Sequence, residues 1–134
     1  MREWVQACKA LKSFRVFHGA GVVSWDDFQP RKIYDSLSLQ KSTLESIWVE
    51  AHEVVHGDHD DEWLESFVGF TALELICASL PNLVGFDEHN LPVRELLNVL
   101  PSSLETLYLH VNEGGSFSGA IDQLAELATS ESFP

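Results

Sequence analysis

Apolar side chains recur along the chain in a six-residue pattern, L-x-x-φ-x-φ, where x is any residue and φ is apolar. Apolar residues at alternate positions are typical of a short β-strand with one buried face. Three of the four copies also have Ser or Thr two places before the leucine and Glu directly after it, whereas the first has Lys in both places. The pattern therefore predicts four equivalent strand segments, anchored by Leu11, Leu44, Leu73 and Leu104.

Three segments between these strands and one segment after the last strand carry apolar residues three and four places apart. This spacing is the stripe of a short amphipathic helix. Pro92 and Pro101 flank one such segment, at positions where prolines commonly begin and end helices. The helices expected from this pattern span residues 33–39, 62–70, 93–100 and 121–128.

Strand and helix signals together recur with a nearly constant period. The four leucines are 33, 29 and 31 residues apart, at or slightly beyond the period of roughly 20–29 residues in leucine-rich repeats. Because neither element can bury its apolar face alone, the units must stack, with a parallel sheet on one face and helices on the other. We therefore predict one α/β domain, 1–134, a short leucine-rich-repeat solenoid of about four strand-loop-helix units: approximately 1–32, 33–61, 62–91 and 92–134. The alternative is chance matching in a Leu-rich chain.

Strand alternation also predicts which side chains lie on the exposed sheet face, namely those between the buried positions. Arg, Trp and Tyr occupy the same place in the first, second and fourth strands, with Cys in the third. These three large residue types are enriched in binding hot spots, although the Trp and Tyr rings would also be placed to pack against each other. The predicted partner-binding residues are Arg15, Phe17, Trp48, Glu50, Cys77, Tyr108 and His110.

Two phrases carry a family resemblance: DDEWLESFVGFTALELICASLPNLVG and VRELLNVLPSSLETLYLHV. They resemble the leucine-rich-repeat region of fungal F-box-type proteins, over about residues 37–128. In that family the repeats imply a substrate-recognition surface, while the F-box docks an adaptor of a ubiquitin ligase. No F-box-like segment precedes the first repeat here, so the resemblance implies a protein-protein interaction module and does not support ligase recruitment.

Charge and composition narrow the class of partner. The formal net charge is −13, which argues against nucleic acid and against anionic membrane surfaces. Seven of the eight Lys and Arg lie within residues 1–41, and seventeen of the 21 acids lie beyond them. The chain has two cysteines, and it contains neither a signal-like apolar stretch nor a membrane-spanning run. These features predict an intracellular protein, cytoplasmic or nuclear. Four units without obvious caps would leave apolar end faces, so end-to-end self-association is expected to be possible.

One motif favours a different function. Residues His52, Glu53 and His56 match H-E-x-x-H, in which two His on one helix face bind Zn²⁺ and Glu activates a water. Read as a helix, residues 44–55 would have a suitable apolar stripe, and the chain would be a zinc-dependent metallopeptidase. Gly57 directly after the second His stops a helix, however, and the strand pattern explains the preceding residues. We therefore expect a non-enzymatic protein without cofactor or metal, in which 52–62 is a solvated loop. The remaining alternative is that the His, Asp and Glu side chains of this loop bind Zn²⁺ or Ni²⁺ loosely, with no catalytic role.

Overall fold

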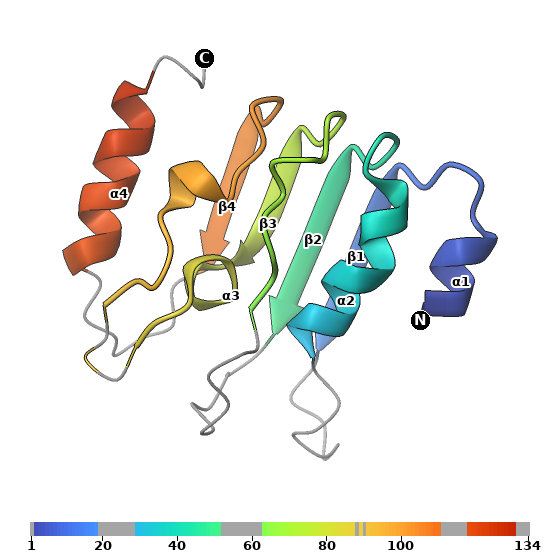
Figure 1. The fold of residues 1–134 in the computed structure, drawn as a ribbon, viewed down its shortest axis with the longest axis horizontal. Coiled ribbons are helices and arrows are strands. Elements are labelled where there is room, and N and C mark those ends of the chain that lie inside the picture. Colours follow the sequence, from blue (N-terminus) through green and yellow to red (C-terminus); the bar gives the residue numbers. More distant parts are fainter. Residues whose placement is uncertain are drawn as a thin grey trace.

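The computed structural model describes residues 2–18, 29–51, 63–87, 89, 91–110 and 118–130. These residues form a mixed α/β fold built on one four-stranded parallel sheet, with the strands in chain order (Figure 1). This arrangement of strands confirms the parallel sheet expected from the repeated pattern. The strands are β1 (Ser13–His18), β2 (Ser46–Ala51), β3 (Leu75–Ser79) and β4 (Thr106–His110).

The strands are aligned at equivalent places in the pattern. One row across the sheet contains the residue two places after each pattern leucine: Ser13, Ser46, Leu75 and Thr106. Just before this row, the carbonyl of Lys12 accepts the amides of Glu45 and Ser46 at 2.7 and 3.0 Å. The Glu45 carbonyl accepts the corresponding pair of amides from the third strand segment, and the Glu74 carbonyl accepts the pair from the fourth. The same backbone junction is therefore made three times.

A single substitution distinguishes the first junction from the others. Lys12 stands where the later copies have Glu, and its Nζ lies 2.7 Å from Oε1 of Glu45. The hydrogen bond that Lys12 donates to the Glu45 carboxylate, together with the negative charge of Glu45, raises the pKa of Lys12. Because both side chains are largely exposed, this ion pair contributes little to stability, and alignment depends on the backbone.

The apolar residues of the pattern point into the core. Leu44, Ile47, Leu73 and Ile76 have no exposed surface, and Val49 and Ala78 are 1% exposed. The corresponding residues of the two outer strands are less covered, because only one described strand lies beside each. Those packed against the core but partly exposed are Leu11, Phe14, Val16, Leu107 and Leu109.

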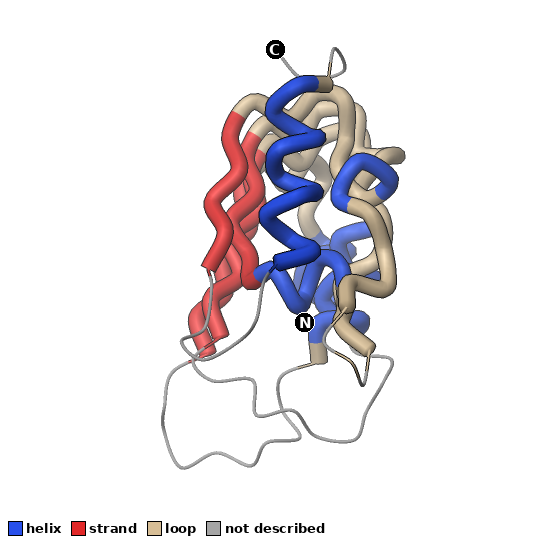
Figure 2. The backbone as a smooth tube through the Cα atoms, turned by 90° about the vertical axis from the view of Figure 1, so that its left-hand side faces the viewer, coloured by secondary structure: helices blue, strands red, loops and turns tan. Residues whose placement is uncertain are grey.

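The helices lie on one side of the sheet (Figure 2). Helix α2 (Pro30–Leu37), followed by the 3-10 turn η2 (Ser38–Gln40), covers most of the predicted 33–39 helix, and α4 (Ser118–Thr129) contains the predicted 121–128 helix. The sequence pattern did not predict α1 (Arg2–Ala7) or α3 (Leu80–Val84). Within the described ranges, no helix has the length and apolar character needed to cross a bilayer.

The helix expected over 62–70 is wrong for residues 63–70, which form irregular coil. Leu64, Phe67 and Phe70 are fully buried, as the apolar spacing indicated. The coil buries them because its amides bond to neighbouring segments: Leu64 donates to the Asn82 carbonyl and Phe67 to the Val99 carbonyl, both at 2.7 Å. Apolar residues at every third place can therefore be buried in an irregular segment as well as in a helix.

The helix expected over 93–100 is reduced to one 3-10 turn, η3 (Leu96–Asn98). The preceding residues run beside the end of α3, where the amides of Val93 and Arg94 donate to the carbonyls of Gly85 and Val84. Gly85 has φ +63°, and a Cβ there would lie 2.7 Å from Cε3 of Trp63. The amides of Val93 and Arg94 are thus paired with the end of α3, and the helical turn begins only at Leu96.

We predict a large difference between two adjacent positions in the coil of 63–70. Phe67 is fully buried, with its ring centroid 5.4 Å from that of Tyr34 and 5.1 Å from that of Phe70. Phe67→Ala should lower the free energy of unfolding by about 3–5 kcal/mol. Val68, at 56% exposure, is the matched control, and Val68→Ala should change it by less than about 0.5 kcal/mol. Urea unfolding of both variants measures this, and equal effects would contradict the described burial.

Candidate functional site

All seven predicted partner-binding residues lie on the strands of the sheet. The register places Arg15, Trp48, Cys77 and Tyr108 side by side in one row that crosses all four strands. A second row, two residues further along, pairs Phe17 with Glu50 on β1 and β2, and Ser79 with His110 on β3 and β4. The structure therefore brings the predicted residues together on one face of the sheet.

The first row is a continuous stack of side chains. The Arg15 guanidinium carbon lies 5.4 Å from the Trp48 ring centroid, within the range of a cation-π interaction. The centroids of Trp48 and Tyr108 are 5.7 Å apart, with the rings inclined by 39°. These two rings belong to β2 and β4, so they meet across β3, above the small side chain of Cys77. The two aromatic side chains pack on each other, and Tyr108 nevertheless remains 51% exposed.

Cys77 was expected to be exposed on the sheet face, but it is fully buried beneath this row, because the Trp48 and Tyr108 rings meet above it. Burial raises the pKa of its thiol, and the nearby charge of Glu50 raises it further. The thiol is therefore protonated at neutral pH. A buried protonated thiol is a poor nucleophile, so the geometry does not support nucleophilic catalysis by Cys77.

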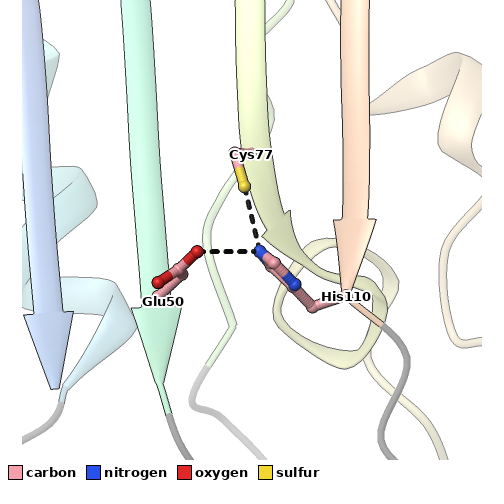
Figure 3. Close-up of side chains that lie close together, drawn as sticks. All are labelled: Glu50, Cys77 and His110. Atoms are coloured by element: carbon pink, nitrogen blue, oxygen red, sulfur yellow. Dashed lines mark hydrogen bonds and ion pairs between the residues drawn. The ribbon is translucent and has the colours of Figure 1, made fainter. Parts of the chain in front are cut away.

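Three polar side chains converge at the end of this face (Figure 3). Sγ of Cys77 lies 3.1 Å from Nε2 of His110, and the same nitrogen lies 3.4 Å from Oε1 of Glu50. Glu50, Cys77 and His110 come from β2, β3 and β4, respectively. Each was predicted as an independent contact for a partner. Their convergence was missed because they are 27 and 33 residues apart in the chain and match no spacing motif.

The H-E-x-x-H segment, with His52, Glu53 and His56, lies outside the described residues, as does the rest of 52–62. The alternative interpretation extended one helix over 44–55. That helix is wrong for the part that the structure describes, because Ser46–Ala51 is strand β2. The alternating residues Ile47 and Val49 are buried as a strand requires.

Comparison of the chain with protein-family models, with curated proteins and with solved structures finds no match in any of the three.

The two cysteines should differ strongly in reactivity. Cys8 is exposed and Cys77 is buried, so modification of Cys77 by a thiol reagent requires the sheet face to open. In Cys8→Ser protein, Cys77 should react at least about 100-fold more slowly than Cys8 does in Cys77→Ser protein, since such opening costs a few kcal/mol. Its rate should also keep rising with pH above the ordinary thiol range. Stopped-flow absorbance with an aromatic disulfide measures both.

Adding Tyr108→Ala to the Cys8→Ser protein should accelerate the reaction, because half of the aromatic cover is removed. Equal rates for the two cysteines in the folded protein would contradict the burial of Cys77.

Proposed function

We propose that the protein is a protein-recognition module of the leucine-rich-repeat type, similar to the recognition part of fungal F-box-associated repeat proteins, and that its exposed sheet face binds the partner. Four observations support the repeat architecture. The strands are parallel, follow chain order, recur every 29–33 residues and make the same backbone junction three times. In stacked repeats of this kind the open sheet face is the usual binding surface.

The observation that carries the proposal is the row of Arg15, Trp48 and Tyr108. These side chains form one stack on strands whose backbones are paired throughout the row. Large flat side chains held in place before binding lose little conformational entropy when a partner arrives. Phe17, at 63% exposure, extends the exposed aromatic surface beside this row. Such a surface matches the composition of a binding hot spot.

The negative charge of this chain indicates which side chains the partner segment carries. Beyond residue 41 the chain has seventeen acids and one basic residue, Arg94, and Glu50 lies on the sheet face itself. We propose that the partner segment has Lys or Arg beside an apolar or aromatic anchor. A cation on such a segment gains from Glu50 and from the exposed face of the Tyr108 ring.

A binding experiment with four proteins tests this function. Immobilised wild type, Trp48→Ala, Tyr108→Ala and Val68→Ala are compared for the proteins they retain from lysate, and retained candidates are then purified for titration. A partner of the sheet face should bind wild type and Val68→Ala alike, since Val68 is at least as exposed as the two aromatic residues but lies in the coil of 63–70. Each aromatic variant should raise Kd by about 30-fold, because loss of a hot-spot side chain costs about 2 kcal/mol of binding free energy.

Two further results complete the test. Circular dichroism must show that the variants keep the wild-type spectrum, and raising the salt concentration should weaken binding if the partner segment is basic. Retention of every partner by all four proteins would exclude the aromatic row as the binding surface. A salt-independent Kd would exclude the basic partner while leaving the surface in place.

A further inference from the structure

The convergence of Glu50, Cys77 and His110 is a consequence of strand register. Glu50 and His110 lie two residues beyond Trp48 and Tyr108, on the strands at either side of β3. The β3 residue beside His110 is Ser79, a small side chain whose hydroxyl accepts the Asn82 amide at the start of α3. Glu50 and His110 therefore reach over β3 toward each other and toward Cys77 (Figure 3).

The separations of the three polar atoms suit a shared metal ion. One ligand atom from each residue lies within 4.8 Å of the other two, and the two contacts to His110 Nε2 are 3.1 and 3.4 Å. A tetrahedral Zn²⁺ with bonds of about 2.0–2.3 Å sets neighbouring ligand atoms about 3.3–3.6 Å apart. The two contacts to Nε2 of His110 already lie close to that separation.

The use of one imidazole nitrogen separates a metal site from a catalytic triad. In a triad, the nucleophile and the orienting carboxylate contact opposite nitrogens of the His ring. Here the Cys77 sulfur and the Glu50 carboxylate both approach Nε2 of His110. Two donor atoms that approach the same imidazole nitrogen fit a cation shared by the three residues, and they do not form a proton relay from sulfur through the ring to the carboxylate.

We infer that Glu50, Cys77 and His110 form a metal site that binds Zn²⁺ through three protein ligands, with the Cys77 thiol releasing its proton to solvent as the sulfur binds the ion. A sulfur, an imidazole nitrogen and a carboxylate oxygen form the donor set that zinc accepts in tetrahedral sites. The side chains of Glu50 and His110 are 35% and 46% exposed, so the fourth position faces solvent and takes a water. This site departs from the sequence-based expectation that the protein has no metal.

The surroundings favour metal binding at this place. Cys77 is covered by the Trp48 and Tyr108 rings, and an apolar shell of this kind shields a metal–sulfur bond from solvent. The three ligands stand on three adjacent strands of one sheet, and rigid strands hold ligands more closely in position than loops do. The inference does not rest on the proposed protein recognition, because metal binding requires no partner, although both proposals use the Glu50 carboxylate.

Cobalt(II) is the probe for this site, because a bond between cobalt and a thiolate produces an intense near-ultraviolet charge-transfer band that histidine and carboxylate ligands do not. Metal-free, reduced protein is titrated with Co²⁺, and the bound ion is then displaced by Zn²⁺. Wild type should show the band at one Co²⁺ per chain, with visible bands of tetrahedral intensity, and Zn²⁺ should abolish them.

The two cysteines provide the matched control. Cys8→Ser should retain the band and Cys77→Ser should lose it. His110→Ala and Glu50→Gln, at partly exposed positions where the fold tolerates change, should each weaken metal affinity by more than about 100-fold, since even changes behind the ligands cost roughly 10–100-fold. The double variant His52→Ala/His56→Ala should behave as wild type, which separates this site from the H-E-x-x-H segment.

Several outcomes would overturn the inference. These are a wild-type titration without the charge-transfer band, a band that survives in Cys77→Ser, or affinity that falls in the His52/His56 variant but not in His110→Ala. Should Cys77→Ser fail to fold, His110→Ala and Glu50→Gln decide the question, because undiminished affinity in both excludes the site. Partner binding is measured separately, with and without bound Zn²⁺. If no partner binds, the conclusion about the metal site is unchanged.

Discussion

The described fold depends on a backbone junction that repeats between successive strands. At each junction one carbonyl, from Lys12, Glu45 or Glu74, accepts two successive amides from the next strand segment. This backbone pairing aligns each strand with its neighbour without any contribution from side chains. A shift of one residue at a junction would turn the buried residues of a strand outward. The alignment therefore determines both the core and the exposed rows.

On the helix side of the sheet, side chains must provide hydrogen-bond partners for irregular segments as well as for helices. The chain between β2 and β4 is mostly irregular where it is described, and its polar backbone groups must find partners. Arg94, the one basic residue beyond Lys41, supplies some of them: its Nη2 donates to the carbonyls of Leu64 and Leu83, and its guanidinium stacks on Trp63 at 5.2 Å. Burial lowers the pKa of Arg94. The most acidic part of the chain thus uses its single arginine to hold coil segments together.

The small size of Cys77 connects the two proposed properties of the sheet face. A large residue at that place in the row would separate the Trp48 and Tyr108 rings, which now meet above it. The same small side chain presents sulfur at the point toward which Glu50 and His110 lean. The contact between the two rings therefore lies next to the polar cluster, because both depend on the residue at this one position of β3. A ligand at the open side of that cluster would lie beside the aromatic row.

The sequence by itself determined the strands and the rows that they carry. Alternation with period two is a local property, so L-x-x-φ-x-φ was sufficient to place residues such as Ile47 inside and Trp48 outside. Only the tertiary structure decided between helix and coil at 63–70, because apolar residues three apart suit both and the deciding hydrogen bonds come from Asn82 and Val99. Only the tertiary structure brought Glu50 to Cys77 and His110, because a meeting across three strands depends on register and side-chain reach, which no spacing along the chain encodes.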